Sequence, residues 1–447
     1  MANRESFGSG FGILVAMAGS AVGLGNLWRF PYLVGTNGGA AFIIIYLAFV
    51  LLLAMPIMYS EFIVGRRSQA NVFGAFKVLA PGTKWCNIGF IYVLGSLAII
   101  SFYCVVGGWT INYFWKAVTF KFAVADTAAL GNMFNQTVTA NYEPLGFMLV
   151  FLVATALIVM AGVKDGIERY TKLMMPLLFL IVVLVAVRSV TLPGAGAGLE
   201  FLFKPDFSKV TANTFLDALG QAFFSLSIGC GTIMTYSSYV CKKENIVGLS
   251  VETAMADTVF AIIAGLAIMP AVFSFGISPS EGPGLVFVTL PYIFAQIPMG
   301  SFLAILFFFM LFIAAITSSI SMLEVIVAYL NEEFKIGRKL AIILSFAVVV
   351  VLGTMCSLSQ GVMADFKIFG NNIFDFFDKL SANILLPVGG FLAVIFVGWK
   401  MKRADVEDEL TSGGTHPFAK AFRNYVYFSI KYLAPIVVAI ILIRGLI

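Results

Sequence analysis

The sequence predicts an all-α integral membrane protein with eleven transmembrane helices, two of which are discontinuous. The 447-residue chain is 60% hydrophobic and only 11% charged, with a mean hydropathy of +0.98. That composition leaves too little polar surface to cover a soluble globule of this size. Apolar runs long enough to cross a bilayer recur along the whole chain. Two of them are interrupted by a Gly-x-Gly motif, at Gly23–Gly25 and at Gly229–Gly231.

The apolar runs predict where each helix crosses the membrane. The first begins near the N-terminus and is not interpreted as a cleaved signal peptide, because it contains Asn26 and Arg29 and ten further runs follow. We therefore expect one transmembrane domain over residues 1–447. Its predicted spans are 9–35, 40–65, 88–117, 146–162, 168–189, 214–240, 250–276, 295–330, 338–357, 375–399 and 424–446.

Basic residues in the short loops predict the orientation of this multi-pass protein. If the N-terminus is cytoplasmic, most lysines and arginines fall in cytoplasmic loops, as the positive-inside rule requires. An odd number of spans then places the C-terminus outside. The net charge of +5 reflects this loop bias and gives no reason to expect a nucleic-acid partner.

The reactive side chains favour neither an enzyme nor a metalloprotein. The only histidine, His416, lies in the loop before the last span, and the five cysteines show no paired spacing. Metal binding and general-base catalysis therefore lack their usual side chains. A channel would need a carbonyl filter or a ring of charges, and the sequence shows neither pattern.

The two Gly-x-Gly interruptions predict a binding site at mid-membrane. Unpaired backbone at that depth must face protein or a cavity, and the breaks occupy corresponding positions in two halves of the chain. The first break frees carbonyls near Ala21 and presents N–H groups where the helix restarts, which favours an anion. The second places the Ser225 and Ser227 hydroxyls beside freed carbonyls, which suits a cation. A zwitterion with a hard cation such as sodium fits both, although helix packing through small residues is the alternative.

Two other spans carry polar side chains that could serve the same site. Ala314, Thr317 and Ser318 share one helix face and offer a carbonyl and two hydroxyls to a monovalent ion. The alternative is that these hydroxyls bond the backbone of their own helix. Tyr103 follows Ile99 by four residues and offers a hydroxyl behind an apolar wall, or else simply packs there.

These residues resemble a known family. The run from Ala18 to Pro31, followed by Asn37–Gly39, resembles the first-helix signature of the neurotransmitter:sodium symporter family. The resemblance covers essentially all spans, and the chain is similar to the bacterial branch that ends after eleven helices. Further matching segments are Pro56 to Arg66, Gly220 to Gly231, Thr235 to Tyr239, Thr289 to Pro291 and Ala314 to Ser319.

The resemblance implies the leucine-transporter fold, in which five helices are repeated in inverted orientation and helices 1 and 6 are discontinuous. The repeats would span about 9–189 and 214–399, with an additional helix at about 424–446. It also implies sodium-coupled import of an amino acid by alternating access, in a bacterial inner membrane, by a monomer or weak homodimer. A transporter-like amino-acid sensor and a proton-coupled carrier are the alternatives.

The resemblance implies two sodium sites. The first would use the Ala21 carbonyl, the side chains of Asn26, Ser225 and Asp257, and the substrate carboxylate. The second would use the carbonyls of Gly19, Val22 and Ala314 with the hydroxyls of Thr317 and Ser318. Most members have asparagine where Asp257 stands, and the position one turn further, which can carry charge in a bacterial member, is Ala261. We therefore expect Asp257 to supply the negative charge and chloride not to be required.

The resemblance also implies how a substrate is held. Its carboxylate would meet the N–H groups around Leu24, between Gly23 and Gly25, and the Tyr103 hydroxyl. Its ammonium would meet the carbonyls of Ala21, Phe224 and Ser225. Because the pocket has no charged lining and Cys230 replaces a phenylalanine, we expect a large neutral amino acid: tyrosine, tryptophan, phenylalanine, leucine or methionine. Its side chain would contact Ile99, Phe224, Cys230, Ser318 and Met322, with Ser227 nearby.

The resemblance also implies which residues form the outer and inner gates and which buried polar side chains support the interrupted helices. On the outer side Arg29 would pair with Asp378 through water, above a lid of Phe224 and Tyr103. On the inner side Arg4 would pair with Glu332, where the family more often has aspartate, and Tyr239 would help to close that end. Glu61 would accept hydrogen bonds from the unwound sixth helix, with snorkelling toward the interface as the alternative. Gln221, just before the second break, is the other structural polar residue expected there.

Overall fold

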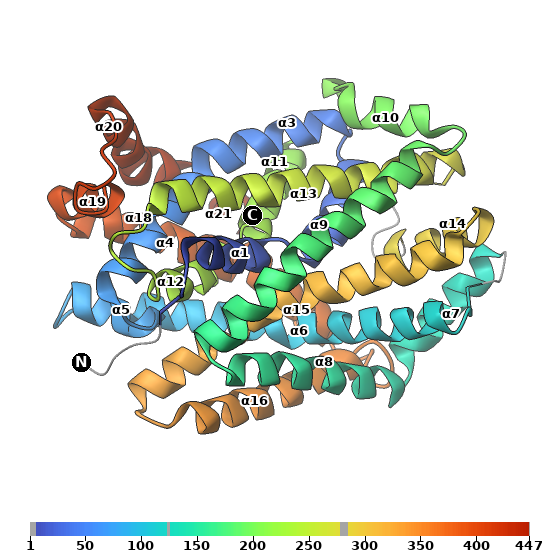
Figure 1. Cartoon of the computed structure of the whole chain (residues 1–447), viewed down its shortest axis with the longest axis horizontal. Helices are drawn as coiled ribbons and strands as arrows, with labels where there is room; N and C mark the ends of the chain where they lie inside the picture. The colour runs from blue at the N-terminus through green and yellow to red at the C-terminus, as the bar shows by residue number, and fades with distance from the viewer. Residues whose placement is uncertain (1–5, 123–125, 278–284, 447) are drawn as a thin grey trace.

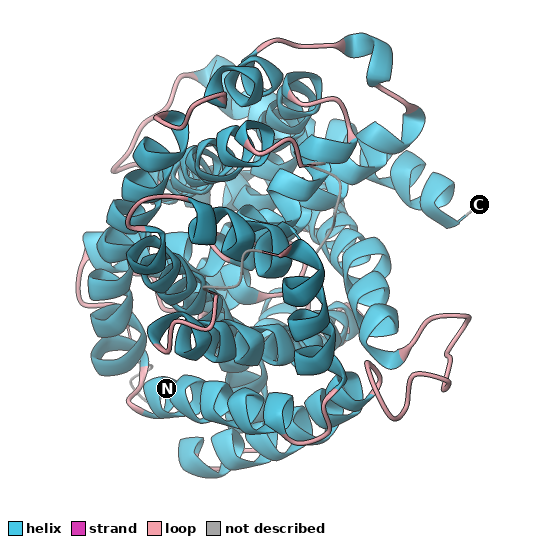
Figure 2. Cartoon of the chain, turned by 90° about the vertical axis from the view of Figure 1, so that its right-hand side faces the viewer, coloured by secondary structure: helices cyan, strands magenta, loops and turns pink. Residues whose placement is uncertain are grey.

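The computed structural model describes residues 6–122, 126–277 and 285–446, and these fold as helices joined by loops (Figures 1 and 2). Most helices run along the long axis of the molecule (Figure 1). Within the described residues, nine helical segments are long and apolar enough to cross a membrane, as the sequence predicted for those positions. The nine segments are Ala40–Ser68, Cys86–Val118, Glu143–Met160, Val163–Val190, Ile246–Ser274, Gly300–Glu333, Arg338–Leu358, Ile373–Lys400 and Lys420–Ile443.

Several of these spans contain wide, π-helical turns. Ala40–Ser68 joins α3 (Ala40–Phe49) to α4 (Met55–Ser68) through such a turn, and Ile373–Lys400 joins α17 (Ile373–Leu380) to α18 (Leu386–Ile395) in the same way. Uninterrupted α-helices make up α6 (Cys86–Val118), α8 (Glu143–Met160), α9 (Arg169–Val190), α13 (Ile246–Ser274), α15 (Gly300–Glu333) and α16 (Arg338–Leu358).

The two remaining predicted spans are the broken ones. The first comprises α1 (Gly10–Ala21) and a second half, Gly25–Thr36, which ends in α2 (Phe30–Thr36) and is bent by 48° at the break. The second comprises α11 (Ala212–Ser225) and α12 (Thr232–Ser237), neither of which is long enough to cross alone. Both breaks occur where the sequence places Gly-x-Gly.

Several boundaries differ from the predicted ones by a few residues, and at the start of the eighth span the difference is a break in the chain that was not predicted. The eighth span was expected from residue 295, but α15 begins at Gly300, and Leu285–Gln296 forms a separate short helix that ends in α14 (Leu290–Gln296). The chain reverses just before Gly300, where Met299 has φ of +61° and a Cβ on Gly300 would lie 1.6 Å from the Phe294 carbonyl oxygen. The residues on both sides of this turn are apolar, so the sequence was interpreted as one continuous span. Pro298 and Gly300 are the residues that form the turn.

The long helices α6 and α15 pack along each other at the centre of the bundle. α1 lies against α9, α13 and α15, and the turn that follows the first break contacts α11. Segments that are distant in sequence therefore meet where the two helices are interrupted. The buried side chains around them form one continuous core.

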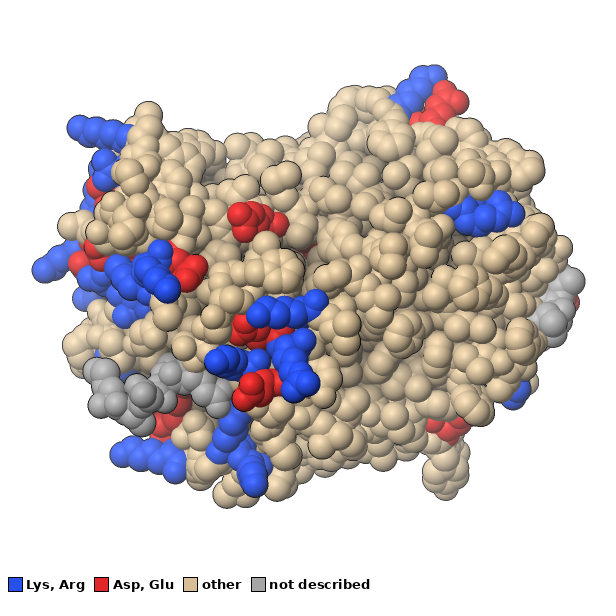
Figure 3. All heavy atoms as spheres, in the orientation of Figure 1, with Lys and Arg blue, Asp and Glu red and all other residues tan. Residues whose placement is uncertain are grey.

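The two ends of the bundle differ in charge. One end carries α5 (Val72–Leu79), α12, α19 (Arg403–Leu410) and α20 (Lys420–Phe428), and the other carries α7 (Thr127–Thr139), α10 (Ala195–Phe203) and α14 (Figure 1). On the face shown in Figure 3, lysine and arginine gather toward the first end. This distribution supports the prediction that the first end is cytoplasmic.

Buried ion pairing holds α19 beneath α4. Arg66 Nε lies 2.7 Å from Glu409 Oε2, and both side chains are almost completely buried. On the exposed side of α19, a hydrogen bond from Lys242 keeps the pKa of the Asp408 carboxyl below its usual range. α19 was not predicted from the sequence, because its eight residues are neither apolar nor periodic enough to stand out.

Candidate functional site

The first interruption turns backbone groups toward the centre of the bundle. α1 ends at Ala21 because Val22 is extended, with φ of −70° and ψ of 104°. Beyond it the Leu24 N–H donates to the Tyr103 hydroxyl of α6 at 3.3 Å. A Cβ on Gly23 would lie 2.5 Å from the Ser318 Oγ, so only glycine fits at this point without displacing its neighbours.

The second interruption depends on left-handed backbone. Ser227, Gly229 and Gly231 all have positive φ, of 54°, 84° and 86°. A Cβ on Gly229 would lie 2.0 Å from the Leu386 carbonyl oxygen, so the chain needs glycine there for space as well as for conformation. The Ser227 hydroxyl donates to the Ser20 carbonyl at 2.8 Å and thereby joins the two interruptions directly.

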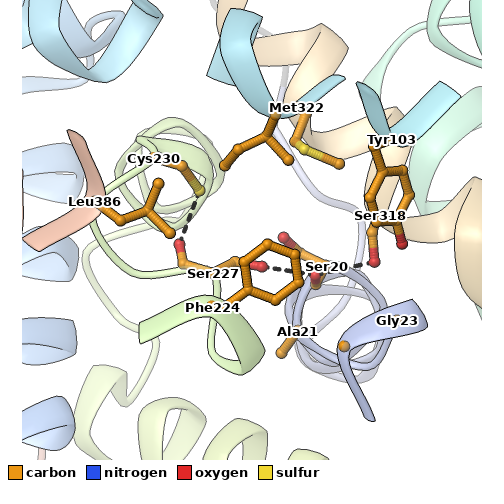
Figure 4. Close-up of a pocket in the computed structure, with 12 residues that line it drawn as sticks. Ser20, Ala21, Gly23, Tyr103, Phe224, Ser227, Cys230, Ser318, Met322 and Leu386 are labelled. Carbon is orange, nitrogen blue, oxygen red and sulfur yellow. Dashed lines mark hydrogen bonds between the residues drawn. The ribbon is translucent and has the colours of Figure 1, made fainter. Parts of the chain in front are cut away.

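A cavity lies between the two interruptions, and Figure 4 shows side chains from both of them facing it. Ten of the twelve predicted substrate residues line this cavity. Leu24 meets it through its bond to Tyr103, and Ser225 faces a neighbouring cluster instead. Ser20 and Leu386 line the cavity without having been predicted. The full lining is Ser20, Ala21, Gly23, Gly25, Ile99, Tyr103, Phe224, Ser227, Cys230, Ser318, Met322 and Leu386.

A fully buried carboxylate, Asp257 of α13, gathers the side chains predicted for the first sodium site. Asn26 Nδ2 lies 2.7 Å from Asp257 Oδ1, and Ser225 Oγ lies 2.9 and 2.8 Å from the two carboxylate oxygens. Tyr46 of α3, which was not predicted, donates to Asp257 Oδ2 at 3.2 Å. These donors are neutral, and no lysine or arginine of the described residues forms an ion pair with Asp257. Ala21, the fourth predicted ligand of this site, lines the cavity.

The residues predicted for the second sodium site meet in part. The Ser318 hydroxyl lies 3.5 Å from the Gly19 carbonyl oxygen and 3.4 Å from that of Ala314, so α1 and α15 present these oxygens together. The Thr317 hydroxyl instead donates to the Ile313 and Ala314 carbonyls of its own helix, both at 3.1 Å. This is the backbone bonding that the sequence left open as the alternative. The Val22 carbonyl follows directly where α1 ends.

The predicted outer gate surrounds a second cavity, which shares Gly25, Tyr103 and Phe224 with the first. Arg29 and Asp378 both line it, together with Phe224 and Tyr103. Arg29 Cζ lies 5.1 Å from the centre of the Phe224 ring. No ion pair within 4 Å joins Arg29 and Asp378 in the described part of the chain, so the water-mediated contact between them stays a prediction.

At the opposite end, the predicted pair of Arg4 and Glu332 includes a residue outside the described ones. Glu332 accepts hydrogen bonds from the Asn71 backbone N–H at 2.7 Å and from its side-chain amide at 3.0 Å. The Tyr239 hydroxyl donates to Glu324 Oε1 at 2.8 Å, and Glu324 forms a 2.7 Å ion pair with Arg338. Glu324 was missed in the sequence, although a carboxylate inside an apolar span is itself a signal.

Two buried polar side chains hold the interrupted helices. Glu61 Oε1 accepts hydrogen bonds from the Gly229 N–H at 2.8 Å and from the Tyr92 hydroxyl at 3.0 Å. Glu61 is fully buried and therefore does not snorkel to the interface. Gln221 Nε2 donates to the Gly25 carbonyl at 3.2 Å and links α11 to the restart of the first helix.

A helical bundle with membrane-length spans and a cavity between two interrupted helices is typical of secondary transporters. The sequence pattern of the sodium:neurotransmitter symporter family matches residues 4–143 and 132–447. The chain belongs to that family: it is a sodium-dependent membrane transporter with the leucine-transporter fold, and it is not an enzyme. The family and fold class predicted from the sequence are thus confirmed.

Relatives of known sequence and structure cover almost the whole chain. It is 39% identical to the uncharacterized sodium-dependent transporter YhdH of Bacillus subtilis, over 98% of this chain and 96% of the relative. It is 38% identical to an uncharacterized sodium-dependent transporter of Haemophilus influenzae, over 99% and 98%. The crystal structure of MhsT in complex with L-phenylalanine matches with a TM-score of 0.93 and 42% identity, covering 99% of this chain and 100% of MhsT.

Proposed function

We propose that this chain is a sodium-coupled symporter that imports a large neutral amino acid by alternating access across a bacterial inner membrane. One observation carries the proposal: the cavity between the two interruptions has backbone and hydroxyl groups at one side and apolar side chains elsewhere. An amino acid has the same division between its zwitterionic backbone and its side chain.

The polar side of the cavity suits the zwitterion. A substrate carboxylate would take the Leu24 N–H, which now lies 3.3 Å from the Tyr103 hydroxyl, and would also accept from that hydroxyl. A helix that restarts beside an anion stabilises it through free N–H groups and its dipole. The ammonium would meet the carbonyls of Ala21, Phe224 and Ser225, which end the two broken half-helices.

The apolar side of the cavity suits a large neutral side chain. Ile99, Cys230, Met322 and Leu386 line it, and none of the lining side chains carries a charge. MhsT, which shares 42% identity with this chain, was crystallised with L-phenylalanine. We therefore propose phenylalanine, tyrosine, tryptophan, leucine and methionine as the substrate group.

The two oxygen-rich clusters are the proposed sodium sites. Asp257 with Asn26 and Ser225 would hold the first ion next to the substrate carboxylate, and its negative charge would replace chloride. The carbonyls near Ser318 would hold the second, with Thr317 turning its hydroxyl away from the backbone it now bonds.

Thermal stability in the presence of ligands tests the proposal. A ligand that binds only the native state stabilises by about 2.7 kcal/mol at 100 times its Kd, so binding raises Tm. We expect large neutral amino acids to raise Tm of the purified protein in sodium and not in potassium, across a screen of all twenty. Equal shifts in both salts would indicate a carrier that is not sodium-coupled, and no shift with any neutral amino acid would contradict the proposal.

Replacing Cys230 by phenylalanine is expected to narrow the substrate range. The ring would fill the space that the thiol leaves beside Met322 and Leu386. Because one methylene in an apolar pocket changes selectivity by about 1–3 kcal/mol, inhibition of leucine uptake by tryptophan should weaken at least about tenfold relative to inhibition by unlabelled leucine. Cys241→Phe, at an exposed cysteine, is the control. An unchanged tryptophan-to-leucine ratio in Cys230→Phe would show that Cys230 does not limit size.

A further inference from the structure

A basic and aromatic cluster lies where the last two spans reach the end of the bundle that carries α19. We call it the interfacial cluster. It is drawn from the end of the Ile373–Lys400 span, the start of α19, and α20 with the turn that follows it. Basic side chains crowd this end in Figure 3. Its members are Trp399, Lys400, Lys402, Arg403, Lys420, Arg423, Tyr427, Lys431 and Tyr432.

The central lysine of the cluster is held by aromatic rings. Lys431 Nζ lies 5.1 Å from the centre of the Trp399 ring, 5.7 Å from that of Tyr427 and 5.6 Å from that of Tyr432. Lys431 belongs to the membrane span Lys420–Ile443, and no carboxylate in the described part of the chain pairs with it. A cation in a span is costly unless it reaches the interface or meets an anion.

The backbone around Lys431 fixes this arrangement. Two π-helical turns, Phe396–Lys400 and Ser429–Leu433, contact each other at the same level of the bundle. A Cβ on Gly398 would lie 2.8 Å from the Lys431 Cα, so the two turns can pack this closely only because residue 398 is glycine. The Trp399 indole N–H donates to the Lys431 carbonyl at 3.0 Å. The ring and the ammonium are thus positioned by the fold.

The charges within the cluster do not balance. Glu407 pairs with both Arg403, at 2.7 Å, and Arg423, at 3.0 Å. The other carboxylates of α19 are engaged elsewhere, because Asp405, Asp408 and Glu409 pair with Arg66, Arg67 and Lys242. Among the described residues, no carboxylate forms an ion pair with Lys400, Lys402, Lys420 or Lys431.

The apolar surface beyond the cluster is suited to acyl chains. Ile436, Ile440 and Ile443 follow Lys431 along the last span and are 58%, 53% and 58% exposed. Tryptophan and tyrosine sit at the level of lipid headgroups, and lysines near an anionic surface gain about 1 kcal/mol each. The cluster thus combines cations at headgroup depth with apolar side chains at acyl depth.

We propose that the interfacial cluster is a binding site for an anionic phospholipid, whose phosphate is held by Lys431 and the neighbouring lysines beside Trp399. A lipid with a net negative headgroup, such as phosphatidylglycerol, supplies the missing charge. Phosphatidylcholine has the same phosphate but carries a quaternary ammonium as well, and the surrounding lysines repel that positive charge. We therefore expect the site to bind phosphatidylglycerol in preference to phosphatidylcholine. Lipid occupancy would fasten the last span to the Ile373–Lys400 span at one membrane surface.

Quenching of Trp399 by brominated lipids measures this selectivity directly. The full-length protein is reconstituted in phosphatidylcholine with increasing brominated phosphatidylglycerol or brominated phosphatidylcholine. Subtracting the signal of the Trp399→Phe variant isolates Trp399 from the other four tryptophans. We expect brominated phosphatidylglycerol to quench Trp399 at a clearly lower mole fraction. Lys431→Gln should reduce that preference about fivefold, the factor that one lysine near an anionic surface provides.

Lys84→Gln is the control, because Lys84 is an exposed lysine that precedes a different tryptophan, Trp85. It should leave the preference at Trp399 unchanged. Equal quenching by the two lipids in the unmodified protein would overturn the proposal, as would equal effects of Lys431→Gln and Lys84→Gln. Recovery of Trp399 fluorescence on adding soluble glycerol phosphate would show that the cluster binds free phosphates, and the lipid assignment would then be wrong.

Discussion

Replacing Asp257 by asparagine is expected to abolish uptake driven by a physiological sodium gradient. Asp257 is fully buried, and its carboxylate is surrounded by neutral donors from Asn26, Ser225 and Tyr46. The negative charge of the Asp257 carboxylate would compensate the positive charge of a cation bound beside it. At an effective dielectric constant of about 20, a unit charge about 3 Å away contributes several kcal/mol. The sodium concentration for half-maximal stabilisation should therefore rise about 100-fold or more.

The same charge predicts that the unmodified protein does not need chloride. Uptake should be unchanged when chloride is replaced by gluconate at constant sodium, because Asp257 already supplies the negative charge. Sodium titrations of Tm and uptake assays in both anions measure the two effects. Glu252→Gln, which removes an exposed carboxylate from the same helix, is the control and should behave like the unmodified protein.

Three results would contradict the proposed role of Asp257 as the charged ligand of the first sodium site. The first is a sodium titration of Asp257→Asn that coincides with that of Glu252→Gln. The second is uptake by the unmodified protein that collapses in gluconate. Loss of uptake with an unchanged sodium titration would place Asp257 in a later step of the cycle and would also contradict the assignment of the ion site.

Replacing Gly23 by alanine is expected to remove substrate-dependent stabilisation and transport. The added Cβ would lie 2.5 Å from the Ser318 Oγ and 3.0 Å from the Tyr103 Oη. Contacts under 3.0 Å force a shift, and here the methyl would point between the proposed substrate carboxylate and the second ion site. Because the chain is already non-helical at this position, the bundle itself should still assemble.

Size-exclusion chromatography and ligand-dependent Tm measure the Gly23 prediction. We expect Gly23→Ala to remain monodisperse while phenylalanine no longer raises its Tm in sodium. Gly146→Ala is the control, since Gly146 lies on α8 and a Cβ there would meet nothing within 4 Å. Normal phenylalanine stabilisation of Gly23→Ala would mean that the cavity is not where the substrate binds.

The spans and the interruptions were predictable because they depend on local properties. A bilayer demands about 20 apolar residues per helix, and glycine adopts the positive φ of Gly229 and Gly231 without the strain that a side chain would add. The turn before Gly300 was missed because the residues on both sides of it are apolar, which concealed the break that Pro298 makes. Pro298 and Gly300 were the residues in the sequence that could have indicated this turn.

The rest of the site could not be read from local pattern. Tyr46 reaches Asp257 across 211 positions of sequence, and Leu386 lines the cavity from a helix that no motif marks. Packing also determines which acceptor a hydroxyl bonds to. The Thr317 hydroxyl, for example, donates to the Ala314 carbonyl of its own helix. Asn26, Ser225 and Asp257 were placed through a family resemblance, and the structure brings them within hydrogen-bonding distance of one another.

Uptake of labelled phenylalanine into proteoliposomes distinguishes a sodium-coupled symporter from a protein that only binds its ligand. With an inwardly directed sodium gradient, we expect accumulation above the external concentration, collapse of that accumulation when the gradient is dissipated, and counterflow on preloading with unlabelled substrate. Accumulation of the same size from a potassium gradient would contradict sodium coupling. Sodium-dependent binding of phenylalanine without uptake or counterflow would contradict transport itself.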